Sequence, residues 1–178
     1  MTAEGFALFD TAIGWCALAW GENGIVGTQL PEGGVEKLRT RMAARFPGAA
    51  ETVPPQEVQD AIDGMTALLR GEANDLLDIR LDLDGVPEFN CRVYEVARAI
   101  PPGKLLTYGD VSHKLGMPGA AQAVGQALGH NPFAIVVPCH RVVASDGKMG
   151  GFSADGGATT KRRMLVIEGA IADELQLF

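Results

Sequence analysis

The chain has 178 residues, of which 47% are hydrophobic and 21% are charged, and its formal net charge at pH 7 is −7. This length is sufficient for one large domain or two small ones. No apolar run reaches the roughly 18 residues that a membrane helix needs, and no charged and then apolar leader opens the chain. We therefore expect a cytoplasmic protein with no membrane partner.

The acidic charge is concentrated in the first half of the chain. Residues 1–86 carry 14 acidic and 6 basic side chains, whereas residues 87–178 carry 8 acidic and 9 basic ones. An acidic protein is a poor partner for nucleic acid, because phosphate binding needs a basic surface. The uneven distribution restricts that argument to residues 1–86.

Apolar periodicity predicts strands and helices in the first half. Three short runs predict an antiparallel meander, and Asn23-Gly24 is a strong hairpin signal between the last two. Two segments with helical spacing follow, and then a strictly alternating run predicts a half-buried strand. The expected strands are 6–9, 15–20, 25–29 and 77–84, and the expected helices are 35–46 and 55–69.

The second half is predicted to be mostly helical. Helices are expected at 89–100, at 106–115 with Thr107 as N-cap and Asp110 completing a near capping box, and at 120–130. The last two are separated by a tight turn at 116–119 and predict a helix-turn-helix. A buried strand is expected at 133–137, after Asn131-Pro132 ends the third helix.

A cysteine directly followed by a histidine is the strongest chemical signal in the chain. Cys139 and His140 come just after the expected strand at 133–137. A thiolate is a nucleophile, and a nearby imidazole acts as a base or lowers the thiol pKa. The same pair is compatible with a structural cysteine beside a histidine that only binds backbone. Since adjacent side chains of a strand point to opposite faces, we expect a bridging water rather than direct contact.

The other two cysteines, Cys16 and Cys91, are interpreted as core thiols. An odd, widely spread set of three cysteines is neither a disulfide framework nor a paired zinc-ligand pattern. Residues 1–86 contain one cysteine and no histidine, which is too few ligands for a structural zinc site. We expect no metal and no cofactor.

Residues 88–170 resemble a known family. The resemblance is carried by Thr107-Tyr108-Gly109, Ala123-Val124-Gly125, Asn131-Pro132, Ile135 to Val142 with its Pro-Cys-His-Arg-Val string, the stretch 147–153, and Lys161 with Glu168-Gly169. These features are similar to the C-terminal domain of the O6-alkylguanine-DNA alkyltransferases, also called methylated-DNA–protein-cysteine methyltransferases. The first half agrees with that family only in the order of strands and helices.

The resemblance implies a fold and a reaction. The fold is α+β, with a ribonuclease-H-like α/β domain at 1–86 and a winged helix-turn-helix-like, mostly helical domain at 87–178 that binds DNA and accepts the alkyl group. The reaction is DNA repair in a single irreversible turnover, in which Cys139 takes a methyl or other alkyl group from O6-alkylguanine in double-stranded DNA, with O4-alkylthymine as a second candidate substrate. We expect a monomer.

The resemblance also implies roles for residues around the thiol. His140 polarises Cys139 through water, and Glu168 orients the imidazole, whereas from the residues alone Glu168 is equally a solvated helix-end charge. Tyr108 hydrogen-bonds the departing base and supplies a proton. Asn131 ties the recognition helix to the active-site strand.

Base binding is implied for a second set of residues. Ser153 and the backbone of Val142 and Cys139 match positions that hold a base flipped out of the duplex. Ala121, Gln122 and Gly125 lie on the recognition helix, and Gln122 stands where the family has an arginine that fills the space left by the base. Because glutamine brings no charge, we expect weak DNA binding.

Three other functions compete with this reading. The chain could recognise alkylated DNA without accepting the group, although Cys139 argues against that. It could be a cysteine hydrolase with a Cys-His-Glu site, but no oxyanion-hole loop is evident. It could be a transcription regulator, but the Ala and Gly residues of the recognition helix offer few groups that read base edges.

Overall fold

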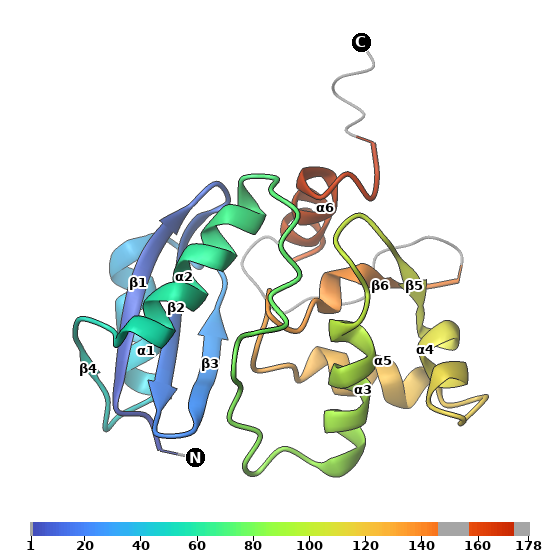
Figure 1. The fold of residues 1–178 in the computed structure, drawn as a ribbon, viewed down its shortest axis with the longest axis horizontal. Helices are drawn as coiled ribbons and strands as arrows, with labels where there is room; N and C mark the ends of the chain where they lie inside the picture. The colour runs from blue at the N-terminus through green and yellow to red at the C-terminus, as the bar shows by residue number, and fades with distance from the viewer. Residues whose placement is uncertain (1, 146–156, 173–178) are drawn as a thin grey trace.

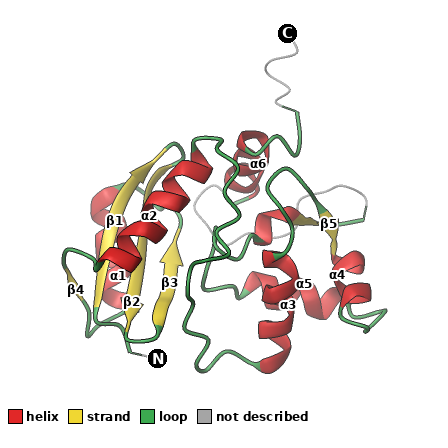
Figure 2. Cartoon of the chain, viewed as in Figure 1, coloured by secondary structure: helices red, strands yellow, loops and turns green. Residues whose placement is uncertain are grey.

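A mixed α+β structure forms from these patterns (Figure 1). The computed structural model describes residues 2–145 and 157–172. The strands of its larger sheet gather at one end of the molecule, and its later helices lie at the other end together with a short two-stranded sheet, as the colouring by secondary structure shows (Figure 2). Among the described residues, no helix is long and apolar enough to cross a membrane.

The expected meander is confirmed. Strands β1 (Gly5–Thr11), β2 (Gly14–Gly21) and β3 (Gly24–Gln29) pair antiparallel in sequence. The hairpin glycine Gly24 has φ 121°, a conformation that glycine adopts without steric cost. A fourth strand that the sequence did not predict, β4 (Ala50–Glu51), pairs parallel with β1 and completes the order β3-β2-β1-β4.

The two predicted helices are confirmed, and they cover the two faces of this sheet. Helix α1 (Val35–Arg45) packs Leu38 and Met42 against one face, and helix α2 (Gln56–Leu69) packs its apolar side against the other. The core under α2 continues into the later helices, so one apolar cluster contains residues from both halves of the chain.

The remaining elements form a second, mostly helical group. It consists of α3 (Glu88–Arg98), β5 (Leu106–Thr107), α4 (Tyr108–Lys114), α5 (Ala121–Gly129), the 3-10 helix η1 (Cys139–Arg141), β6 (Val142–Val143) and α6 (Ala158–Ile167). The three predicted helices are confirmed to within about two residues at each end. The capping box is also confirmed, because Thr107 accepts from the Asp110 N–H and Asp110 accepts from the Thr107 N–H.

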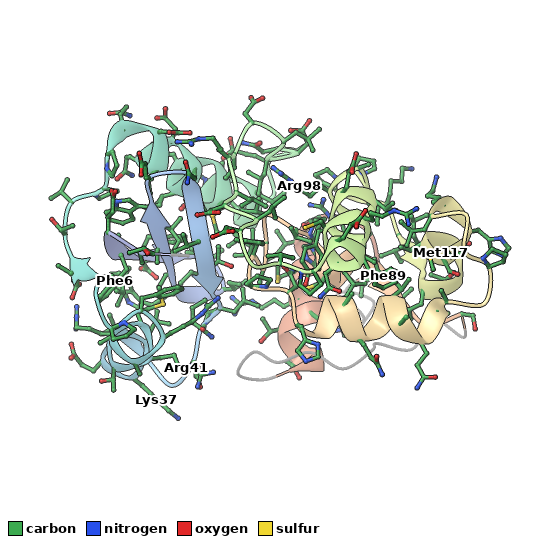
Figure 3. The ribbon with its side chains drawn as sticks, turned by 90° about the horizontal axis from the view of Figure 1, so that it is seen from below. Phe6, Lys37, Arg41, Phe89, Arg98 and Met117 are labelled. Carbon is green, nitrogen blue, oxygen red and sulfur yellow. The ribbon has the colours of Figure 1, made fainter. Side chains whose placement is uncertain are left out.

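The strand predicted at 77–84 is wrong. Only Leu81 forms an isolated bridge, with Ile25. Arg98 of α3 explains why the other residues of this segment form no strand (Figure 3). Its Nη2 donates to the carbonyls of residues 76, 77 and 79 and so holds the segment in an irregular turn. The alternation of apolar residues therefore reflects contacts along a loop, with Leu77 and Leu83 exposed.

The strand predicted at 133–137 is also wrong, although its burial is confirmed. The segment turns on itself, because the Val137 N–H donates to the Phe133 carbonyl at 2.8 Å and Asn131 Oδ1 accepts from the Phe133 N–H at 2.9 Å. Ile135 has φ 78°. The Cys139-His140 pair then lies in η1 rather than in an extended strand.

Candidate active site

Cys139 is the first residue of η1 and follows the turn at 131–137. It is a free thiol and only 8% exposed. Its backbone N–H donates to the Val137 carbonyl at 2.8 Å, which fixes the direction in which the chain enters η1. The thiol is therefore held by a rigid turn rather than by a flexible loop.

Burial and polar neighbours act on the Cys139 thiol in opposite directions. Burial raises its pKa above the ordinary value, because a thiolate is poorly solvated in an apolar environment. The Asn131 side chain, the positive charge of Lys161 and the backbone amides of Cys139 and His140 lower it. In the resting protein the thiol is protonated at neutral pH, and these donors face the sulfur on which charge develops when it reacts.

Asn131 connects the end of α5 to this turn. Its Nδ2 donates to the Val137 carbonyl at 2.9 Å, while its Oδ1 accepts from the Phe133 N–H. Both groups of the amide are thus engaged with the backbone of the segment that carries Cys139. This arrangement fits the tie between helix and active-site segment that we expected.

His140 is fully buried and bonded to Glu168. Its Nε2 lies 2.8 Å from Oε2 of Glu168, whose side chain is 1% exposed. Burial lowers the pKa of His140, and the Glu168 carboxylate partly offsets that effect. The imidazole is accordingly neutral at pH 7, and its Nδ1 is buried with no hydrogen-bond partner among the described residues.

Arg141 holds the other side of Glu168, a contact that sequence reasoning missed. Arg141 Nε and Nη2 donate to the two carboxylate oxygens at 2.8 and 2.9 Å, and Nη1 donates to the Ile100 carbonyl at 2.8 Å. Burial alone would raise the pKa of Glu168, but the bonds from His140 and Arg141 dominate and bring it to about 2. An arginine among buried apolar residues, as in Cys-His-Arg-Val-Val, was the available signal for a buried ion pair.

Lys161 is a second buried cation near the thiol. It lies in α6, is 1% exposed and donates from Nζ to the Val142 carbonyl at 2.8 Å. Burial lowers its pKa, whereas Cys139 raises it. Val142 itself pairs with Leu106 in the short parallel sheet of β5 and β6, so its backbone is fixed beside the start of α4.

Tyr108 is the first residue of α4, and its ring packs against α5 near the thiol. Burial and the neighbouring Cys139 both raise the pKa of its phenol, which therefore keeps its proton at neutral pH. Gly125 of α5 faces the ring, and a Cβ there would lie 3.8 Å from Tyr108 Cε1. Tyr108, Asn131 and Cys139 are thus brought together from three parts of the sequence.

The other expected base-binding residues divide into two groups. Ala121 is partly buried and Gln122 is exposed on α5, on the outer surface and away from the His140–Glu168 pair. Ser153 lies outside the described residues.

Of the other cysteines, Cys16 is buried as expected, with a pKa raised to about 12 mainly by burial, whereas Cys91 is only partly buried.

The arrangement defines a class of site in which a buried free cysteine lies beside a buried histidine that is bonded to a glutamate and, through it, to an arginine. Such a site can perform a displacement by sulfur, with the neutral imidazole available to take up the thiol proton. Among the described residues, no group of three His, Cys, Asp or Glu side chains is placed to hold a metal ion.

Comparison with known proteins identifies the family. The model of the 6-O-methylguanine DNA methyltransferase, DNA binding domain, matches residues 88–170. The methylated-DNA–protein-cysteine methyltransferase of Mycobacterium tuberculosis is 36% identical over 174 residues, which cover 97% of this chain and 98% of that protein. The crystal structure of Mycobacterium tuberculosis OGT in complex with DNA superposes with a TM-score of 0.74 at 33% identity and covers 93% of each chain.

A third relative carries a different name. The DNA base-flipping protein of Thermus thermophilus is 37% identical over 138 residues, which cover 78% of this chain and 88% of that protein. The chain belongs to the methylated-DNA–protein-cysteine methyltransferase family.

Proposed function

We propose that this protein repairs alkylated DNA by transferring an alkyl group from O6 of guanine to Cys139, once per molecule. Family membership over nearly the whole chain supports DNA as the partner and alkyl transfer to cysteine as the reaction. The observation that carries the assignment to Cys139 is its position in η1 beside the buried His140–Glu168–Arg141 network.

The proposed step is a displacement at saturated carbon. The Cys139 sulfur forms a bond to the alkyl carbon as the bond from that carbon to O6 breaks, and the electron pair stays on the guanine. The thiol proton passes to His140, through a water at its unpartnered Nδ1. The departing guanine takes a proton from Tyr108, whose raised pKa keeps the phenol protonated before the step. The proton held by His140 then returns to the tyrosinate through water, so that the net transfer is of the thiol proton to guanine.

The chemistry explains why the protein acts once. A thioether has no leaving group that water displaces readily, so Cys139 stays alkylated. Asn131 and the amides of η1 stabilise the developing negative charge on sulfur before transfer. After transfer the sulfur is neutral and larger, and these groups lose the charge that they stabilised.

Access to Cys139 requires the base to leave the duplex, at a cost of a few kcal/mol. We propose that Ala121, Gln122 and Gly125 place α5 against the DNA, and that Val142 and Ser153 contact the flipped base. The small side chains of α5 support this, because they allow close approach of the helix backbone. The position of Gln122 on the outer surface supports its role at the space left by the base.

We also propose the domain organisation that the resemblance implies. Residues 1–86 form a ribonuclease-H-like domain, and residues 87–178 form a winged helix-turn-helix-like domain. The meander followed by a helix and a parallel strand supports the first assignment. Helices α4 and α5, joined by a short turn and followed by β6 paired with β5, support the second. A monomeric state and a cytoplasmic location stay predictions.

A cysteine comparison tests the proposed acceptor. With a duplex labelled in the methyl group of one O6-methylguanine, the wild-type protein and a Cys91→Ala control are expected to become labelled, whereas Cys139→Ala stays unlabelled but still binds the duplex. Labelling of Cys139→Ala would refute Cys139 as the acceptor. Binding by all three proteins without labelling would favour lesion recognition alone.

A further inference from the structure

Two residues from the first half of the chain bind the turn that leads to Cys139. Thr28 of β3 donates from Oγ1 to the Ala134 carbonyl and from its backbone N–H to the Pro132 carbonyl, each at 2.9 Å. Arg45, at the end of α1, donates from Nη2 to the same Pro132 carbonyl at 3.2 Å. Three hydrogen bonds thus converge from the first sheet and its helix on one short segment.

Arg45 is built into this contact. Its Nη1 donates to the Thr28 carbonyl at 2.5 Å and to Oε1 of Gln29 at 3.3 Å, and its guanidinium lies 4.8 Å from the centre of the Phe46 ring. Burial lowers the pKa of Arg45, and the nearby charge of Arg41 adds to that effect. A planar guanidinium with several fixed donors can bind carbonyls of two different elements at once, which a lysine ammonium does less well.

The turn needs such support because of its backbone geometry. Ile135 has φ 78°, a region that β-branched residues rarely adopt and that persists only where the surroundings determine it. The Thr28 hydroxyl binds the carbonyl of the peptide between Ala134 and Ile135. It therefore fixes the orientation of the peptide plane that enters this conformation.

The same turn determines where the thiol lies. Beyond Ile135, the Val137 carbonyl accepts from Asn131 Nδ2 at 2.9 Å and from the Cys139 N–H at 2.8 Å. A change in the peptide at 134–135 would move Val137 and, with it, the sulfur relative to Asn131. Thr28 is thus connected to Cys139 through hydrogen bonds to the backbone of the segment that carries the cysteine.

We propose that Thr28 and Arg45 are positioning residues for alkyl transfer: by holding the carbonyls of Pro132 and Ala134, they fix the thiol of Cys139 in its reactive place. The inference rests on the proposed transfer to Cys139. None of the residues placed at the reacting atoms lies in the first half of the chain. The inference gives that half a direct part in the rate of the reaction.

Paired variants test the proposal. Thr28→Val keeps the shape and the backbone N–H but removes the hydroxyl, and Thr28→Ser restores it. Thr40→Val is the matched control, because Thr40 is an exposed threonine of α1 whose hydroxyl donates only to the Glu36 carbonyl. Arg45→Met is compared with Arg41→Met, since Arg41 lies on the same helix and is exposed (Figure 3).

Single-turnover transfer from a duplex with one O6-methylguanine, with protein in excess, is the main readout. Thr28→Val is expected to slow transfer about tenfold, because a buried carbonyl loses its donor. The transfer rate of Thr28→Ser should lie within about threefold of the wild-type rate, and the duplex affinity of every variant should lie within about twofold of the wild-type affinity. Arg45→Met should also slow transfer, whereas both controls should not.

A second readout separates this inference from the proposed function. Iodoacetamide modification of Cys139, followed in its own peptide without DNA, should be faster in Thr28→Val than in wild type, because a thiol displaced from its buried place is more exposed and more easily ionised. If the wild-type protein transfers nothing, both the proposed function and this inference fail. If wild type transfers normally, a Thr28→Val transfer rate equal to or above that of wild type, or a modification rate no faster than that of wild type, would overturn the inference alone. The inference would also fail if the unfolded fraction of Thr28→Val accounted for its slower transfer, or if Thr28→Ser did not restore the transfer rate.

Discussion

At the scale of single residues, the site depends on one carboxylate shared by two buried partners. Glu168 binds His140 through one oxygen and Arg141 through both. Arg141 keeps the carboxylate ionised, and the ionised carboxylate in turn holds the neutral imidazole in one orientation. Removal of one member would leave a buried charge without its partner, which costs about 3 to 5 kcal/mol.

This coupling predicts a pH-dependent stability for Glu168→Gln. The pKa of Glu168 lies at about 2 in the folded protein against an ordinary value of 4.5. The stability that the ionised group contributes, about 3 kcal/mol, is therefore present above pH 4.5 and is lost as the pH falls toward 2. Urea unfolding should show Glu168→Gln well below wild type at pH 7, with the difference shrinking below pH 4.5.

Glu57→Gln provides the control for that measurement. Glu57 also binds an arginine through two oxygens, but both it and Arg80 are exposed. An exposed pair contributes little, so the midpoint of unfolding should barely change. A constant difference between Glu168→Gln and wild type from pH 7 to pH 3 would contradict the buried ionised carboxylate.

The Cys139 thiol carries a second pH prediction. Burial raises its pKa above 9.0, so the thiolate fraction in the folded protein should still increase with pH at that point. Because the thiolate is the nucleophile, iodoacetamide modification of the Cys139 peptide should keep rising between pH 9 and 10. The urea-unfolded chain is the control and should level off earlier. A folded-state profile that levels below pH 9 would show a stabilised thiolate instead.

At the scale of elements, α5 is the proposed contact with DNA, and its outer face lacks a cation. Gln122, Gln126 and His130 are exposed at successive helical turns. Affinity for a duplex depends strongly on charge, because each phosphate neutralised releases counterions. The helix can approach the backbone closely, but it gains little from the electrostatic attraction that usually dominates.

Gln122→Arg should strengthen this contact. We expect higher affinity for duplex DNA, faster repair, and a slope of log affinity against log salt that is steeper by about 1. Gln56→Arg adds the same charge at an exposed position of α2 and serves as control. Equal effects of the two substitutions would indicate a general charge effect, and no gain from Gln122→Arg would argue that α5 does not enter the DNA as proposed.

Local patterns predicted most elements, because apolar periodicity and turn residues act over short distances. The meander and helices were found in this way, and the Thr107–Asp110 box located the start of α4. The segments at 77–84 and 133–137 were mistaken for strands, because their backbone is held by side chains distant in sequence. Arg98 holds the first, and Thr28 and Arg45 help to hold the second.

The candidate site was predictable to a similar extent. Cys139 and His140 stand out as a pair, and the family pattern pointed to Glu168, Tyr108 and Asn131. The pattern did not indicate how Arg141 and Glu168 pair. That pairing depends on η1 and the end of α6 meeting in the core, 27 residues apart in sequence.

At the scale of the whole molecule, the overall charge of −7 gave a misleading first impression. The acidic residues belong mainly to the half that carries the sheet, while every residue proposed at the reacting atoms lies in the nearly neutral half. The two halves still share one apolar core and the hydrogen bonds of Thr28 and Arg45. The first half therefore supports the site through these contacts.

Mass spectrometry of the intact protein after incubation with a duplex containing O6-methylguanine tests the central claim most directly. We predict a gain of one methyl group per molecule, located on the Cys139 peptide, with repair stopping at one equivalent of DNA. Repair beyond one equivalent, a methyl group on another residue, or DNA binding with no change in protein mass would contradict single-turnover transfer to Cys139.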